Sequence, residues 1–529
     1  MLDKPVCPGR STRTGRTVST LLASVVIAIF GAMPGCSLGN IAADPCKNND
    51  ECVLTIGPMS QCTNGYCTDP PACKTGHDCR KLAGGGACVE GFCVSTFPTH
   101  PQCTSLHEPA DLLDKRLAGP GAPLVIGSIY SLSELKDQVL AESVRLAVDE
   151  INNQGGGMNR NKNLGVVVCD NGGPGNKAVD AERKTLTNNA VDYLAGTLGV
   201  PYIVGPLSSA DSLNVVGRIL EKGYPTVVIS ASSTSPTLTD FDDALNNGKP
   251  GLFWRTCPSD VLQGEVMAVE VIAKDPAVTK VAVIYSNDAY GQGLSAVFRD
   301  NYGLMNSKLF PVNDQQFDDP SFMTSLATDV NAYAPNGVLV ITVRAGNTIA
   351  VVKSLADTMA GNAKFFFTDG AKDATAMFDP ALPAKVQSII AASQGTAPAS
   401  PFGAVYETFR ANFNAKFQRD PADFSFTAHA YDATYIGAYG VIWASRDNDN
   451  YDGNNVADGM LQLSSGMAVN ISFSDWGTGK TTLVSGMPIN VKGASGELQF
   501  NPDTGEAPGN IEIWAASGGM FTTVGTITP

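Results

Sequence analysis

Histidine and basic residues are scarce in this chain of 529 residues. Three of its four histidines precede residue 110, and His429 alone remains beyond it, which argues against histidine-dependent hydrolysis or a histidine-rich metal centre there. Lysine and arginine number 36 against 51 acidic residues, and the net charge of −15 argues against binding to nucleic-acid phosphates. With 16% charged and 43% hydrophobic residues, the chain is too apolar to be disordered and too polar for a multi-span membrane protein.

No segment reaches the roughly 20 apolar residues that span a bilayer. The apolar run Leu21–Met33 is shorter and follows a basic stretch, which predicts an export signal over residues 1–35. The run ends at Met33-Pro34-Gly35-Cys36, which resembles a bacterial lipobox, although Met33 and Pro34 depart from the usual pattern. We therefore expect an exported protein that Cys36 anchors by lipid to the bacterial cell envelope, facing the periplasm or the cell surface. The alternative is a plain signal peptide with a chance cysteine.

A four-cysteine unit is written twice between residues 46 and 93, with similar spacings and similar ends, Asn64-Gly65-Tyr66-Cys67 and Glu90-Gly91-Phe92-Cys93. Beyond an export signal, disulfides are the expected state, and so short a segment needs them in place of a core. Four cysteines allow three pairings, among which we take first-to-third and second-to-fourth as the working hypothesis. Zinc fits the wide gaps poorly. The cysteines are Cys46, Cys52, Cys62 and Cys67, then Cys73, Cys79, Cys88 and Cys93.

One cysteine is left over at the end of this Cys-rich region, which we place at residues 46–103. Cys103 is free to pair with Cys169 or Cys257, or to stay reduced. The Cys-rich repeat is expected to act as a stalk, a spacer or a docking module. Residues 104–122 contain Gly119-Pro120-Gly121 and lack sustained periodicity, which predicts a linker.

From residue 123 onward, apolar runs alternate with helical patterns. Runs such as Leu164–Val168 and Lys280–Tyr285 are continuous and β-branched, which is typical of parallel strands covered on both faces. Between the first two runs, apolar residues recur at helical spacing up to Ile151, and Gly155 follows as a stop. The pattern predicts an α/β fold with doubly wound sheets, and about 400 residues exceed one core, so two lobes are expected.

Seven segments in register give this region a family resemblance. It resembles the type 1 periplasmic binding proteins, specifically the branched-chain amino-acid (Leu/Ile/Val) binding branch or its receptor-like relatives, over residues 123–529. The resemblance implies two Rossmann-like lobes joined by a three-strand hinge, with lobe 1 at about 123–255 and 391–491 and lobe 2 at about 256–390 and 492–529. The segments are Ala147–Gly156, Gly205–Ser209, Ile229–Thr239, Phe253–Thr256, Asn287–Leu294, Thr368–Gly370 and Gly496–Gly505.

Small hydroxyl residues follow two strands of the predicted first lobe, where ligands of open α/β sheets bind. Short side chains let backbone N–H groups approach an anion, and a helix N-terminus adds a favourable dipole. Helix capping is the competing role, above all for Ser208. The resemblance implies that Ser209 and Thr234 hold an amino-acid carboxylate, with further contacts from Ser232 and Ser233.

The second lobe is expected to contribute three residues. Tyr290 would wall the ligand and donate one hydrogen bond. Asp369 would pair with an α-ammonium group. Arg344 stands near a position where the family often has an aromatic residue. If Arg344 points into the cleft, a ligand with a second carboxylate becomes plausible; otherwise it is a solvated surface residue.

Signals of enzymatic activity are weak. Ser133-Glu134-Leu135-Lys136 fits S-x-x-K without its partner motifs, and the phosphate-loop-like Gly477–Thr481 lacks its first glycine. Acidic residues at 447–452 fail the calcium-loop register. We therefore expect no enzyme, no cofactor and no metal.

The predicted function is capture of a small polar ligand, an amino acid or amide, by a lipoprotein that serves ABC-type uptake. One alternative is a receptor ectodomain that senses a ligand and signals to a membrane partner. The other is a structural or adhesive surface protein without a ligand.

Overall fold

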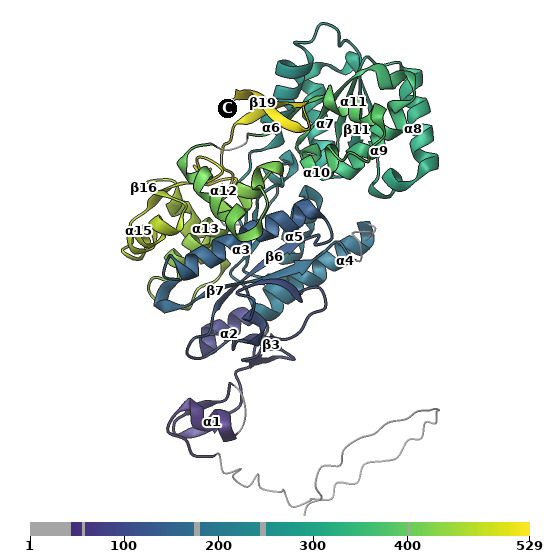
Figure 1. Ribbon diagram of the computed structural model, residues 1–529. Helices are drawn as coiled ribbons and strands as arrows, with labels where there is room; N and C mark the ends of the chain where they lie inside the picture. Colours follow the sequence, from purple (N-terminus) through teal and green to yellow (C-terminus); the bar gives the residue numbers. More distant parts are fainter. Residues whose placement is uncertain (1–43, 56–58, 174–179, 244–249, 400–401) are drawn as a thin grey trace, which may run out of the picture. The chain divides into compact units, whose positions relative to one another are not determined.

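The computed structural model describes residues 44–55, 59–173, 180–243, 250–399 and 402–529 (Figure 1). The description below concerns the unit from Pro45 to Pro529. The predicted export signal and Cys36 lie outside the described residues. Within the described ranges, no helix is at once long enough and apolar enough to cross a bilayer.

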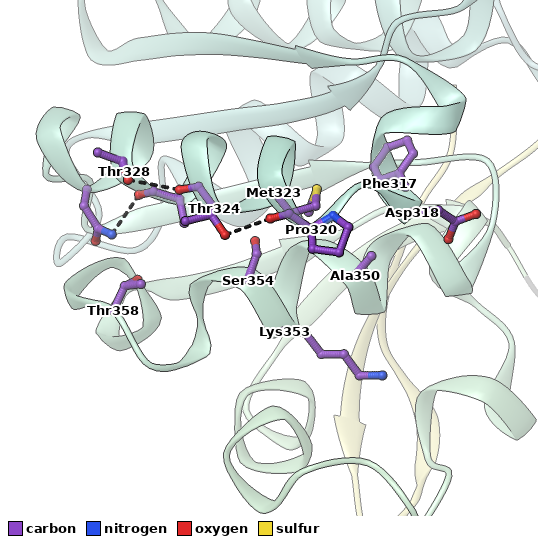
Figure 2. Close-up of a pocket in the computed structure, with 12 residues that line it drawn as sticks. Phe317, Asp318, Pro320, Met323, Thr324, Thr328, Ala350, Lys353, Ser354 and Thr358 are labelled. Carbon is purple, nitrogen blue, oxygen red and sulfur yellow. Dashed lines mark hydrogen bonds between the residues drawn. The ribbon is translucent and has the colours of Figure 1, made fainter.

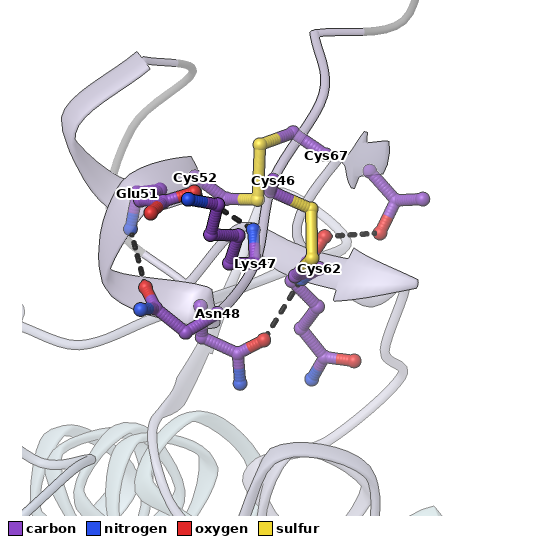
Figure 3. Close-up of a disulfide and its surroundings, with 10 residues drawn as sticks. Cys46, Lys47, Asn48, Glu51, Cys52, Cys62 and Cys67 are labelled. Atoms are coloured by element: carbon purple, nitrogen blue, oxygen red, sulfur yellow. Dashed lines mark hydrogen bonds between the residues drawn. A yellow bond between two sulfur atoms is a disulfide. The ribbon is translucent and has the colours of Figure 1, made fainter. Parts of the chain in front are cut away.

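Both cysteine units fold as a short helix followed by an antiparallel hairpin. In each unit the first cysteine bonds the third and the second bonds the fourth, which is the arrangement favoured above. Figure 3 shows the two disulfides of the first unit close together beside its helix. The elements are α1 (Asn49–Thr55), β1 (Gln61–Thr63) and β2 (Tyr66–Thr68), then α2 (Gly76–Ala83), β3 (Ala87–Val89) and β4 (Phe92–Val94).

The first lobe is built on a six-stranded sheet in the order β10-β9-β8-β6-β7-β5. Pairing is parallel except at the edge, where β5 runs antiparallel to β7. The continuous apolar runs explain the burial of β6–β9, because a parallel sheet is covered on both faces. The strands are β5 (Ser105–Glu108), β6 (Leu124–Tyr130), β7 (Leu164–Asp170), β8 (Tyr202–Val204), β9 (Val227–Ser230) and β10 (Phe253–Arg255).

The helices of the first lobe come from two separate stretches of the chain. The earlier stretch supplies α3, α4 and α5, and the later one supplies α12–α15 with a small parallel pair, β16 and β17. Their bounds are α3 (Leu135–Asn153), α4 (Asp180–Val191), α5 (Ser209–Lys222), α12 (Ala404–Phe417), α13 (Thr427–Ala444), α14 (Gly453–Met460), α15 (Phe473–Val484), β16 (Met467–Asn470) and β17 (Ile489–Lys492).

The segment predicted as a linker contributes to this sheet. Strand β5 pairs with β7, and a disulfide joins Cys103 to Cys169 beside it. Leu112 is fully buried against Gly165, where a Cβ would lie only 2.5 Å from the leucine side chain. The Cys103–Cys169 disulfide and the packing of Leu112 on Gly165 therefore hold this stretch on the lobe. Cys257 is a free, buried cysteine.

The second lobe is built on a seven-stranded sheet in the order β12-β11-β13-β14-β15-β18-β19. The first five strands are parallel and the last two antiparallel, with α6–α11 around them. The strands are β11 (Val281–Ser286), β12 (Ser307–Val312), β13 (Gly337–Ile341), β14 (Lys364–Phe367), β15 (Gln394–Pro398), β18 (Ile511–Ser517) and β19 (Met520–Ile527). The helices are α6 (Asp260–Glu265), α7 (Ala289–Tyr302), α8 (Pro320–Tyr333), α9 (Ala345–Ala356), α10 (Ala374–Met377) and α11 (Ala384–Ala391).

The chain passes between the two sheets three times, after β10, after β15 and before β18. The second and third passages therefore fall beyond the predicted limits at residues 391 and 492. Arg255, fully buried at the first passage, donates to the carbonyls of Ser233 (2.8 Å) and Ser235 (3.0 Å) and pairs with Glu506 on the third. Two of the three passages are thus joined by one guanidinium.

Candidate functional site

Ser208 and Ser209 stand where the chain leaves β8 and enters α5. The Ser208 hydroxyl accepts a hydrogen bond from the N–H of Asp211 (3.1 Å), so Ser208 caps the helix. Ser209 is buried, and its hydroxyl accepts from the N–H of Ser235 (3.2 Å). Both serines line a small cavity between the lobes. A helix N-terminus with small side chains at such a place favours an anion.

The residues predicted after β9 take different roles from one another. Ser232 lines the same small cavity and donates to the carbonyl of Leu207 (2.9 Å). Ser233 is fully buried, and its hydroxyl lies 2.7 Å from that of Ser212, so it braces α5. Thr234 is also buried, and its carbonyl accepts from the N–H of Asp260 (2.8 Å). Of these three residues, only Ser232 is among the lining residues of the cavity.

Tyr290 and Asp369 meet the cavity from the second lobe. The Tyr290 hydroxyl donates to Asp369 Oδ1 (2.6 Å), and Gln263 Nε2 donates to the same oxygen (2.8 Å). Burial, and then the charge of Asp369, raise the pKa of Tyr290 well above its ordinary value, so this phenol stays a donor. The residue after Asp369 must be glycine, because a Cβ on Gly370 would lie 1.7 Å from the Thr342 carbonyl oxygen. The carboxylate is therefore held firmly at the strand end.

Arg344 does reach the cleft. It follows β13 at the start of α9 and lines a second cavity of about 200 Å³, together with Arg183, Asp211 and residues of the turn after β11. Although burial opposes it, the charges of Asp137 and Asp314 raise the pKa of Arg344, so its guanidinium stays charged. The two cavities share Ser208 and Val343 and therefore adjoin.

Sequence reasoning missed Lys136 as a site residue and considered it only as part of an S-x-x-K motif. Lys136 lies in the first turn of α3, is 6% exposed and lines the small cavity beside Phe426. Burial lowers its pKa, and the charges of Asp369, Asp373 and Asp137 work against that fall. The available signal was a lysine in the first helical turn after a buried strand, in a helix whose next turns are apolar.

The small cavity encloses about 10 Å³, close to the space of one water. An amino acid therefore enters this site only if the lobes move apart. A larger cavity of about 550 Å³ lies between α8 and α9, wholly on the second lobe (Figure 2). It contains none of the predicted site residues and does not involve the first lobe.

The motifs that suggested enzyme or metal chemistry have structural roles. Gly477–Thr481 lies inside α15 and forms no loop. Asp449 pairs with Arg160 (3.0 Å), and Asp452 caps α14. The sulfurs of both cysteine units are joined in disulfides, which removes them as zinc ligands.

Two α/β lobes joined by three passages, with polar strand ends meeting between them, define a ligand-binding protein of the type 1 periplasmic fold. The family model "Receptor family ligand binding region" matches residues 139–519, and the chain belongs to this family.

Two curated relatives match over a shorter stretch. The Leu/Ile/Val-binding protein BraC3 of Rhizobium johnstonii is 29% identical over 184 residues, 34% of this chain and 43% of the relative. The Leu/Ile/Val-binding protein homolog 3 of Brucella melitensis is 28% identical over 182 residues, with the same coverage. The chain thus matches less than half the length of these relatives.

Solved structures share the fold over most of the chain. The leucine-binding protein LivK of Thermotoga maritima has a TM-score of 0.59 at 18% identity, covering 77% of this chain and 99% of its own. LivJ of Streptococcus pneumoniae, in complex with isoleucine, has a TM-score of 0.54 at 18% identity, covering 77% and 100%. A Rhodopseudomonas palustris solute-binding protein in complex with 4-hydroxybenzoate has a TM-score of 0.56 at 13% identity, covering 77% and 97%.

Proposed function

We propose that this protein is an extracytoplasmic solute-binding lipoprotein that captures a small polar ligand, an amino acid or amide, for ABC-type uptake. One observation carries the proposal. Ser209 and Ser232 from the first lobe and Tyr290 and Asp369 from the second line a single buried cavity between the lobes. The names of the relatives add support, because both curated proteins are named for binding leucine, isoleucine and valine.

The residues divide the ligand's two charged groups between the lobes. The N-terminus of α5 with Ser209 and Ser232 would receive the carboxylate, because unpaired helix N–H groups and hydroxyls donate to an anion. Asp369, oriented by Tyr290 and Gln263, would receive the α-ammonium group. Ser208 acts as the helix cap beside them, while Ser233 and Thr234 support the loop from behind.

Binding then acts through shape alone. A ligand that touches both lobes favours their closed arrangement by its differential affinity for that state. No bond of the ligand needs to be made or broken, which is why we propose a binding protein without enzymatic activity. The closed form would be presented to a membrane permease, with lipidated Cys36 keeping the protein at the cell envelope.

A sensor that signals to a membrane partner is the second candidate, and one observation favours it. The second cysteine unit is fastened to the first lobe by two hydrogen bonds. Arg80 Nη1 donates to the carbonyl of Gly199 (2.8 Å), and His77 Nε2 lies within hydrogen-bond distance of Thr226 Oγ1 (3.1 Å). An N-terminal segment held in this way would follow any movement of the lobe.

A thermal-shift and calorimetry panel of the common amino acids and their amides tests the proposal. At 100 times its Kd, a ligand adds about 2.7 kcal/mol to the free energy of unfolding. Asp369→Asn should remove the shift, because the buried ammonium loses its counter-charge, at a cost of about 2–5 kcal/mol of binding. Asp318→Asn, at an exposed acid of the second lobe, is the matched control. The proposal is wrong if no compound of the panel binds, or if Asp369→Asn binds the ligand as the unchanged protein does.

A further inference from the structure

Two positively charged side chains, one from each lobe, reach the adjoining cavities of the cleft. Lys136 belongs to α3 of the first lobe and lines the small cavity, whereas Arg344 precedes α9 of the second lobe and lines the wider one. The cavities share Ser208 and Val343, so both cations border one continuous space.

Neither cation has the bonding partners that its chemistry demands. An ammonium has three donors, but in the described part of the chain Lys136 Nζ finds one acceptor, the Asp369 carbonyl at 3.4 Å, and lies 5.4 Å from the Phe426 ring centroid. A guanidinium has five donors, and within the described residues that of Arg344 makes no hydrogen bond or ion pair, while its Nε is buried. Lys136 is buried and Arg344 half-buried, and nearby acids offset part of both charges. Their free hydrogen-bond donors still suit an anionic group of a ligand.

The acids around the wider cavity are already engaged as acceptors. Asp211 accepts from the Ser208 hydroxyl (2.8 Å), Asp288 accepts from the N–H of Gly291 (2.9 Å), and Asp314 accepts from Asn347 Nδ2 (3.2 Å). Asp137 lies across the cleft and accepts from the N–H of Ser131 (2.9 Å), yet no ion pair joins it to Arg344. These carboxylates keep their charge and balance part of that of Arg344, but none of them accepts a hydrogen bond from Arg344 or Lys136, whose donors therefore remain available to a ligand.

We infer that the ligand of this cleft carries an anionic group beyond its α-carboxylate, held between Lys136 and Arg344, and that the ligand class is therefore the acidic amino acids. The inference rests on the proposed function, because it assigns the α-ammonium to Asp369 and the α-carboxylate to the start of α5. A distal carboxylate between the two cations contacts both lobes at once. It therefore supplies differential affinity for the closed arrangement.

The test is calorimetry of the purified protein with four probes, L-glutamate, L-aspartate and their neutral amides L-glutamine and L-asparagine. The unchanged protein should bind one acid at least about tenfold more tightly than the matching amide, since a paired buried charge contributes on that scale. Arg344→Gln and Lys136→Met should each abolish this preference. Arg344→Lys keeps the charge and should keep the preference. Arg446→Gln, at an arginine that contacts Trp443, is the control away from the cleft.

The outcomes separate this inference from the proposed function. If the amides bind as tightly as the acids, the acidic ligand class is wrong and amino-acid binding stands. If the preference survives in both Arg344→Gln and Lys136→Met, the assignment of the second anionic group to these two cations is wrong. If none of the common amino acids binds, both ideas fail. Circular dichroism and the melting temperature of each variant identify a folding defect, and in that case Arg344→Lys decides by keeping or losing the preference.

Discussion

The two cysteine units share their disulfides and their hairpins but differ in what they contact. In both units a backbone N–H after the first cysteine donates to an acid ahead of the second, Lys47 to Glu51 (2.7 Å) and Lys74 to Asp78 (2.8 Å). The second unit also binds the first lobe. The first unit contacts the second unit, through a hydrogen bond from Gln61 to the carbonyl of Leu82 (3.4 Å) and packing of Met59. The residues that the two units share therefore build the fold of each unit, and residues that they do not share attach the second unit to the first lobe.

The docking residues occupy positions where the first unit has different side chains. Gly76, His77 and Arg80 of the second unit correspond to Asn49, Asp50 and Val53 of the first, counting from the first cysteine of each. Gly76 lets α2 approach the end of the helical turn at Leu198, and Arg80 lies over the Tyr451 ring (4.6 Å) and donates to the Tyr451 carbonyl (3.2 Å). One small scaffold thus serves as a fixed support in one copy and as a less constrained unit in the other.

The largest expected difference between the two units is in the effect of losing one disulfide. Loss of Cys79–Cys93 in the double alanine variant should lower the melting temperature of the lobes, because a disulfide in a small domain contributes about 2–5 kcal/mol and α2 packs on the first lobe. Loss of Cys52–Cys67 should open only the first unit to protease. Calorimetry with limited proteolysis measures both effects. Equal melting temperatures for the two double variants would contradict the difference in docking.

Gly76→Ala tests the close approach of α2 to the first lobe. The new Cβ would lie 2.4 Å from the carbonyl carbon of Leu198, and overpacking of this kind costs about 1–3 kcal/mol. Urea unfolding of the lobes should report that loss. Asn49→Ala, at the matching place in the first unit, removes an acceptor for the N–H of Cys62 (2.8 Å) and should leave lobe unfolding unchanged. A Gly76→Ala protein as stable as the parent would show that α2 is not seated there.

Lowering the pH should destabilise the second cysteine unit on the first lobe, with a smaller effect than the two changes above. Burial, with the charges of Arg80 and Lys81, lowers the pKa of His77 well below 6.5. The unfolded state therefore binds the proton more readily, so the contribution of His77 is present above about pH 6.5 and is lost as the pH falls below it. The difference in melting temperature between pH 7 and pH 5 should shrink in His77→Gln. Asp50→Asn in the first unit is the control, and an unchanged pH dependence in His77→Gln would refute this role.

The sequence was sufficient for features that depend on local patterns. The continuous run Leu164–Val168 became β7, and repeated cysteine spacing located both disulfide units. Strand β5 could not be predicted, because Ser105–Glu108 is short and is held by pairing with β7 and by the Cys103–Cys169 disulfide beside it. These contacts join residues far apart in the chain.

The site residues likewise divide into those that local sequence predicts and those that depend on contacts between distant parts of the chain. Small hydroxyls at strand ends were visible in the sequence, but which of them line the cavity depends on the turn after β9, where Ser232 faces the cleft and Ser233 turns to Ser212. Lys136 becomes a cleft residue only when α3 meets the opposite lobe at Asp369. The predicted binding roles of all these residues stay predictions until a ligand is measured.

The guanidinium of Arg255 connects the loop after β9 with a passage between the two sheets. It donates to the carbonyls of Ser233 and Ser235 in the loop after β9 and pairs with Glu506 on the third passage between the sheets. This loop and the third passage are therefore tied to each other. If the lobes separate as the proposed function requires, we expect the ligand to stay with the first lobe and its release to begin at Tyr290 and Asp369.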